Sequence, residues 1–139
     1  MIGKTIPLVT APVEGRSVGN VSALLAEISS LLEKHLQTGE AAAIDLKSLP
    51  FSPGEYDRLK GILGQGELVA KLEAIGPSEI VETRYPGVWW LTHRSVDGDI
   101  VAEVIEVTQC PDILKSQAPD MGAGLGRLHS LLYSDPPSD

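Results

Sequence analysis

The sequence has a single cysteine, Cys110, among its 139 residues. One thiol cannot form a disulfide within the chain, and it cannot complete the four-cysteine site of a structural zinc ion or an iron–sulfur cluster. A lone cysteine followed by a proline at a strand end is typical of an inert, packed thiol. We therefore expect the chain to bind no metal ion and no organic cofactor of its own.

An excess of basic charge is also missing, because 11 Lys and Arg residues stand against 19 Asp and Glu, which gives a formal net charge of −8. Nucleic acids and anionic membrane surfaces are bound mainly by Lys and Arg side chains, so neither is an expected partner. A protein partner with a basic patch fits this charge better. No apolar run approaches the length of a membrane span, and residues 1–12 are too short and interrupted for a signal peptide, which predicts a cytoplasmic protein.

Catalytic motifs are absent from the sequence as well. It contains no Gly-x-Ser-x-Gly elbow, no His-Glu-x-x-His and no Cys-x-x-Cys. Gly64-Gln65-Gly66 precedes a predicted strand, whereas a dinucleotide fingerprint must follow a strand and open a helix, so we interpret it as a turn. The glycines around Gly124 fail on the same ground. The sequence therefore gives no reason to expect an enzyme.

Hydrophobic periodicity predicts helices in both halves of the chain. Apolar residues recur at steps of three and four over residues 18–37, which predicts an amphipathic helix. A capping box formed by Ser52 and Glu55, with Pro53 at the first helical position, predicts the start of a second helix. Further helical turns are predicted over residues 111–117 and 119–133, where three glycines weaken the pattern.

The remaining apolar segments have the length and period of strands. They cover residues 41–46, 67–74, 79–84, 88–94 and 100–108. The predicted fold is α+β, an antiparallel β-meander of four to five strands with helices packed on one face. With 139 residues and 42% hydrophobic content, the chain is large enough for one core and one domain, with residues 1–12 and 134–139 expected to be flexible.

Asp97-Gly98 predicts a tight hairpin, because a type I′ turn needs positive φ at both central residues. This turn pairs Trp90 with Ile105, Trp89 with Glu106, and His93 with Ala102. Adjacent strand residues point to opposite faces, so we expect one tryptophan in the core and the other at a docking surface, with the choice between Trp89 and Trp90 left open. The alternative is that helices cover both faces of the hairpin.

Several short motifs follow one another between residues 62 and 107. They are Gly64-Gln65-Gly66-Glu67, Gly76-Pro77-Ser78-Glu79-Ile80, Glu82-Thr83 and Pro86-Gly87-Val88-Trp89-Trp90. In this order they resemble the conserved C-terminal region of hydrogenase expression/formation proteins of the HupH/HyaF type, the accessory proteins encoded with uptake NiFe hydrogenases. The resemblance extends over roughly residues 20 to 114. Longer members of that family carry two related modules, so this chain is similar to a single-module form.

The resemblance implies a chaperone-like accessory protein without enzyme activity. Its expected partner is the precursor of the iron–sulfur small subunit or another hydrogenase accessory protein. The candidate partner-binding residues are Glu82, Pro86, Gly87, Trp89, Trp90, His93 and Glu106. The alternative, from a different class, is a metal- or cluster-handling protein or a small enzyme. It would use Glu67, Glu79, Glu82, Glu106 and His93, and possibly Cys110, as ligands or acid–base groups.

Overall fold

The computed structural model describes residues 17–134 and residue 138. It divides the chain into two compact units, Met1–Gln109 and Cys110–Asp139. The expectation of a single domain stays a prediction. Residues 1–12, which were expected to be flexible, lie outside the described residues. Most of the expected flexible tail, residues 134–139, lies outside them as well. Ser134 is described, and it is the last residue of a helix.

Between residues 17 and 109, the described part of the first unit, there are two α-helices. α1 spans Ser17–Thr38, and α2 spans Glu55–Leu63. The apolar stripe predicted for α1 is confirmed, because Val21, Leu24 and Ile28 are buried. The predicted start of α2 is wrong, since Gly54 with φ of 89° is the residue before the helix. Half of the expected capping box still forms, with the Ser52 backbone N–H donating to Glu55 Oε1 at 2.6 Å.

Within the described residues, five strands form one antiparallel sheet in the order β1-β5-β4-β3-β2. The strands are β1 (Ala42–Asp45), β2 (Val69–Ala74), β3 (Gly76–Glu82), β4 (Val88–Arg94) and β5 (Ile100–Val107). β2 to β5 form the meander, and β1 adds beside β5. A short 3-10 helix, η2 (Leu46–Ser48), follows β1 and places the buried side chain of Leu46 in the core. The predicted α+β class is confirmed.

The register of the β4–β5 hairpin is the predicted one. Trp90 lies opposite Ile105, Trp89 opposite Glu106, and His93 opposite Ala102. The turn type was wrong, because only Gly98 (φ 94°) has positive φ, and its N–H donates to the Ser95 carbonyl at 2.9 Å. That pattern is a type I turn closed by a glycine in the left-handed region. A register shift between His93 and Arg94 absorbs the extra residue, so the pairs nearer the core keep the expected register.

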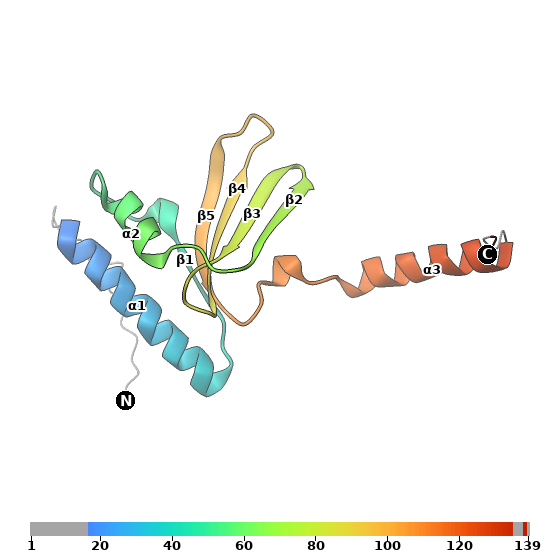
Figure 1. Ribbon diagram of the computed structural model, residues 1–139, viewed down its shortest axis with the longest axis horizontal. Helices are drawn as coiled ribbons and strands as arrows, with labels where there is room; N and C mark the ends of the chain where they lie inside the picture. The colour runs from blue at the N-terminus through green and yellow to red at the C-terminus, as the bar shows by residue number, and fades with distance from the viewer. Residues whose placement is uncertain (1–16, 135–137, 139) are drawn as a thin grey trace. The chain divides into compact units, whose positions relative to one another are not determined.

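The two faces of the sheet differ in what covers them. Figure 1 shows α1 and α2 together on one side of the sheet, and their side chains pack there in one buried cluster. The cluster consists of Leu24, Ile28, Ile44, Leu46, Leu59, Leu63, Val88, Trp90 and Ile105. We call this side the helix-covered face, and the other side, which carries Ile80, Trp89 and Leu91, the second face. Both faces bury apolar side chains of β4.

The second unit contains a short 3-10 helix, η3 (Asp112–Leu114), and the helix α3 (Ala118–Ser134). The helical turns predicted for this part of the sequence are therefore present. α3 buries no residue, and its large apolar side chains are exposed.

No helix in the described part of the chain combines the length and the apolar character that a membrane crossing requires.

Candidate partner-binding surfaces

Trp89 and Trp90 are both buried, each with only 4% of its surface exposed. The expectation that one of them lies open at a docking surface is therefore wrong. The Trp90 indole enters the core beneath α2, and the Trp89 indole N–H donates to the Thr108 carbonyl at 3.0 Å on the second face. Ile80 and Leu91, which share that face, are buried as well. The alternative, that helices cover both faces of the hairpin, stays a prediction, because α1 and α2 both pack on the helix-covered face.

Glu103 is a buried carboxylate that organises the side chains around Trp90. Its Oε2 accepts hydrogen bonds from Tyr56 Oη at 2.6 Å, Trp90 Nε1 at 2.8 Å and Thr92 Oγ1 at 3.0 Å. Burial, and then the hydrogen bond to the Glu103 carboxylate, raise the pKa of Tyr56 above its ordinary value, so its hydroxyl stays a donor. Three donors on one oxygen compensate the loss of water around the buried carboxylate. These hydrogen bonds connect α2 to β4 and β5.

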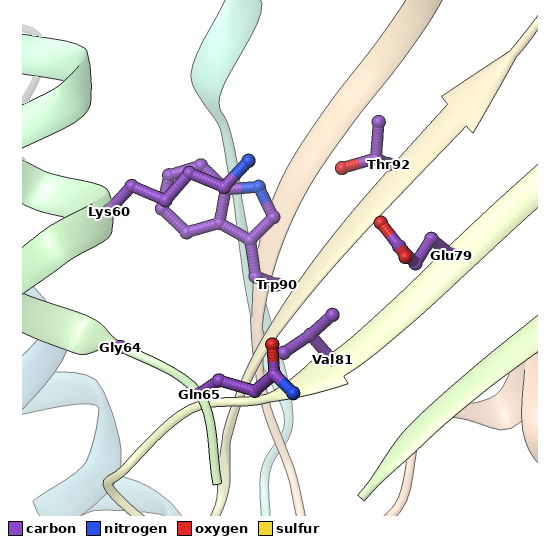
Figure 2. A pocket seen from close by; sticks show the side chains of 7 residues that line it. All are labelled: Lys60, Gly64, Gln65, Glu79, Val81, Trp90 and Thr92. Carbon is purple, nitrogen blue, oxygen red and sulfur yellow. The ribbon is translucent and has the colours of Figure 1, made fainter.

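A cavity of about 350 Å³ lies beside Trp90 on the helix-covered face. Figure 2 shows the Lys60 side chain over the Trp90 ring, with Glu79 and Thr92 on neighbouring strands. Lys60 Nζ is 5.4 Å from the centre of the Trp90 ring, a distance within the cation–π range. The walls thus carry one cation and one carboxylate, which suits a polar segment with hydrogen-bonding groups and does not suit an apolar one.

The acidic candidates and the candidate histidine do not converge on one site. Glu82 and Glu106 lie on either side of Trp89 on the second face, while Glu79 points to the helix-covered face. His93 Nδ1 is 2.7 Å from Ser78 Oγ, its cross-strand neighbour. In the part of the chain that the structure describes, no three His, Cys, Asp or Glu side chains are placed to hold a metal ion together. Cys110, half-buried, has its Sγ 3.7 Å from the Pro111 carbonyl.

Pro86 and Gly87 form the turn between β3 and β4, and the buried Thr83 shapes that turn. Thr83 Oγ1 donates to the Val88 carbonyl at 2.8 Å and accepts from the Tyr85 N–H at 3.1 Å. Gly87 has φ of 94°, and a Cβ added there would lie 3.1 Å from Leu32 Cδ1 of α1. The positive φ favours glycine, and a larger residue would also need the Leu32 side chain to shift. The turn therefore lies close to α1.

An apolar groove opens next to this turn, between α1 and α2. Its volume is about 350 Å³. The lining side chains are Leu25, Ile28, Ser29, Leu32, Ile62, Leu63, Tyr85 and Val88, none of which is charged. Ser29 and Tyr85 are exposed at its edge. We call this feature the α1–α2 groove. Such a lining is typical of sites that receive apolar side chains from a ligand or a partner.

The α1–α2 groove was not predicted as a site, although its α1 residues belong to the predicted apolar stripe. That stripe is wider than the core needs. Leu24 and Ile28 reach the buried cluster, while Leu25 and Leu32 remain only partly buried at the groove. The sequence signal was the stripe's excess width, together with the neighbouring Pro86-Gly87 motif.

Glu27 is a buried acid on α1, with 8% of its surface exposed, and burial raises its pKa above the ordinary value. Above the folded-state pKa, Glu27 is charged in the folded protein, and burying that charge lowers the stability of the fold. Below the unfolded-state pKa, Glu27 is protonated in both states, so the cost disappears. We expect Glu27→Gln to be more stable than wild type at pH 7, with the difference shrinking as the pH falls to 4. Thermal melts between pH 4 and 7 measure this. The exposed Glu33→Gln controls for net charge, and a difference for Glu27→Gln that does not change with pH would contradict the assignment.

A solved structure, the hydrogenase expression protein HupH from Thiobacillus denitrificans, is 41% identical, with a TM-score of 0.77 over 80% of this chain and 92% of that one. Hydrogenase expression/formation protein HoxQ of Azotobacter vinelandii is 25% identical over 81% of this chain, and protein HupH of Rhodobacter capsulatus is 27% identical over 83%. This chain spans only 40% and 42% of the length of those two relatives. The family model described as "HupH hydrogenase expression protein, C-terminal conserved region" matches residues 18–134. The chain therefore belongs to this family of hydrogenase expression proteins.

Proposed function

We propose that this chain is an accessory protein of NiFe hydrogenase maturation that works by binding and not by catalysis. Its proposed partner is the precursor of the iron–sulfur small subunit, or an accessory protein that handles that precursor, and its proposed location is the cytoplasm. Family membership over residues 18–134 supports the link to hydrogenase expression. The relatives' names describe expression or formation of hydrogenase, which fits a role in assembly.

The observation that carries the binding proposal is the α1–α2 groove. A lining of leucine, isoleucine, valine and tyrosine with one serine hydroxyl offers apolar contact area and few groups that need specific hydrogen bonds. It suits apolar side chains presented by one face of a helix or by an extended segment. An incompletely assembled subunit exposes such segments, and a groove that covers them would keep them from aggregating.

The charge of the chain favours the same kind of partner. With a net charge of −8, the protein attracts a partner that carries basic residues beside its apolar segment. The uncharged groove would then supply contact area, and the net negative charge of the protein would speed the encounter. Polar rims around apolar centres are the usual anatomy of such interfaces.

Two adjacent serines on α1 allow a matched test of the groove. Ser29 is exposed and lines the groove, whereas Ser30 is exposed and lies roughly 100° further around the helix. We expect Ser29→Glu to lower the amount of hydrogenase small-subunit precursor captured per folded molecule at least about 10-fold, because a charge at the groove edge must lose water on binding. Ser30→Glu should change capture by less than about twofold, since it lies outside the desolvated contact.

Capture is measured by affinity purification from cells that make the hydrogenase, followed by quantification of the precursor and of known accessory proteins. Thermal melts of both variants confirm that they fold. Equal capture by both variants would contradict the role of the groove. Wild-type protein that captures neither precursor nor accessory proteins would contradict the function itself.

A further inference from the structure

The cavity beside Trp90 is a polar hollow that the first unit forms by itself. Its volume of about 350 Å³ falls in the range of small-molecule sites. Its lining residues all lie between positions 60 and 92, within the first unit. Figure 2 shows the ends of the Gln65, Glu79 and Thr92 side chains directed towards the space beside the Trp90 ring. The cavity shares no lining residue with the α1–α2 groove, so the two are separate sites.

One wall of this cavity presents hydrogen-bond acceptors. Glu79 and Thr92 are cross-strand neighbours on β3 and β4. The Thr92 hydroxyl donates its one proton to Glu103 at 3.0 Å, so Thr92 Oγ1 can only accept a hydrogen bond from the cavity. The Glu79 carboxylate accepts as well, and the buried Glu103 carboxylate places a second negative charge behind Thr92. This wall therefore suits a positively charged donor such as an ammonium group.

The other wall, formed by α2 and the residues after it, presents hydrogen-bond donors. Lys60 Nζ lies 5.4 Å from the centre of the Trp90 ring and 5.6 Å from that of the Tyr56 ring. These cation–π contacts position the ammonium group over the two rings and leave it N–H donors for an acceptor in the cavity. Gln65 adds a side-chain amide to the same wall. This wall therefore suits a carboxylate.

The two opposite charges in the cavity do not neutralise each other. In the described part of the chain, neither Lys60 nor Glu79 takes part in an ion pair. Figure 2 shows them coming from different elements, Lys60 from α2 and Glu79 from β3, with the Trp90 ring between them. A free α-amino acid carries both of its charges on one carbon atom, so it cannot contact both walls at once. A dipeptide with free ends carries its ammonium and carboxylate groups at opposite ends of a short chain.

We propose that this cavity is a binding site for a short zwitterionic peptide of about dipeptide length. The ammonium group of the peptide binds to the Glu79 carboxylate and to Thr92 Oγ1, and its carboxylate binds to Lys60 and the Gln65 amide. Val81 and the Trp90 ring supply the wall between the two ends. The site lies outside the α1–α2 groove and does not rest on the proposed function.

The indole N–H signals of the two tryptophans test this proposal by NMR on the full chain. Trp90 lines the cavity, whereas Trp89 lies on the second face, so one protein contains both the reporter and its control. We expect added alanyl-alanine to shift the Trp90 signal along a saturable curve and to leave the Trp89 signal in place. The expected dissociation constant is on the order of 1 mM, as for a small ligand held by a few charged contacts.

Capped peptides and matched variants test the two walls separately. Acetylation of the amino end removes the ammonium charge, and amidation of the other end removes the carboxylate, so each capped dipeptide should bind at least about 10-fold more weakly. Glu79→Gln should weaken alanyl-alanine to the same degree. Glu33→Gln, at an exposed position of α1, removes the same charge and should change binding by less than about twofold. Thermal melts confirm that both variants fold.

Three results would overturn the proposal. They are a Trp90 signal that alanyl-alanine does not move, capped dipeptides that bind as well as the free one, and binding that Glu79→Gln leaves unchanged. Capture of hydrogenase proteins through the α1–α2 groove is measured independently, so none of these results contradicts the proposed function.

Discussion

Replacing Glu103 with alanine is expected to lower the free energy of unfolding by about 3–5 kcal/mol. The substitution removes the single carboxylate oxygen that accepts from Tyr56, Trp90 and Thr92. It leaves the buried donors of Trp90 and Thr92 and the half-buried hydroxyl of Tyr56 without their acceptor. Water cannot readily replace that acceptor, because Glu103 is 4% exposed and lies between α2 and the sheet. Chemical denaturation of wild type and variant, followed by tryptophan fluorescence, measures the loss.

Two further variants make this test specific. Glu103→Gln keeps the side-chain shape and one acceptor oxygen, so its loss should be smaller than that of alanine. Glu73→Ala, at an exposed position of the edge strand β2, should change stability by less than about 0.5 kcal/mol. A Glu103→Ala protein as stable as the Glu73→Ala protein would show that the buried hydrogen bonds contribute nothing net.

Alanine at either tryptophan should cost about 3–5 kcal/mol of stability, since both rings are 4% exposed and each removal opens a cavity. Trp90→Ala also removes a donor to Glu103 and an edge-to-face contact with Tyr56, whose ring centre lies 5.6 Å away. Trp89→Ala removes the hydrogen bond to the Thr108 carbonyl. Capture of the partner per folded molecule should be unchanged in both variants, because neither ring lines the α1–α2 groove.

Thermal melts and the capture assay, applied to the same preparations, distinguish stability from binding for these two residues. If Trp89→Ala melted like wild type and yet lost its partner, Trp89 would be a docking residue despite its burial.

The local fold could be predicted wherever a short-range rule decides it. The period of two over β4 and β5, together with Gly98, placed the hairpin and its register correctly. The turn type was missed because both kinds of turn give the same residue pairs near the core. The observed type I turn has one additional residue, and the register shift between His93 and Arg94 absorbs it. The start of α2 was missed because Pro53 and Gly54 form a turn of their own before the helix.

The candidate site could not be predicted because it depends on contacts between distant parts of the sequence. The α1–α2 groove brings together Leu25 of α1, Ile62 of α2 and Tyr85 before β4. Strand alternation correctly placed Trp89 and Trp90 on opposite faces. It could not show that both faces are covered at those two positions, or that a glutamate 13 residues from Trp90 would accept its indole N–H.

A photo-reactive amino acid at position 29 tests most directly whether a maturation partner occupies the α1–α2 groove. The exposed Ser29 tolerates the replacement, and the same replacement at Ser30 is the control. Cells that make the hydrogenase are irradiated, and the crosslinked proteins are identified by mass spectrometry. The proposed function predicts that position 29 crosslinks to the hydrogenase small-subunit precursor or to another hydrogenase accessory protein, and that position 30 does not. No crosslink to these proteins from position 29, or equal crosslinking from both positions, would contradict it.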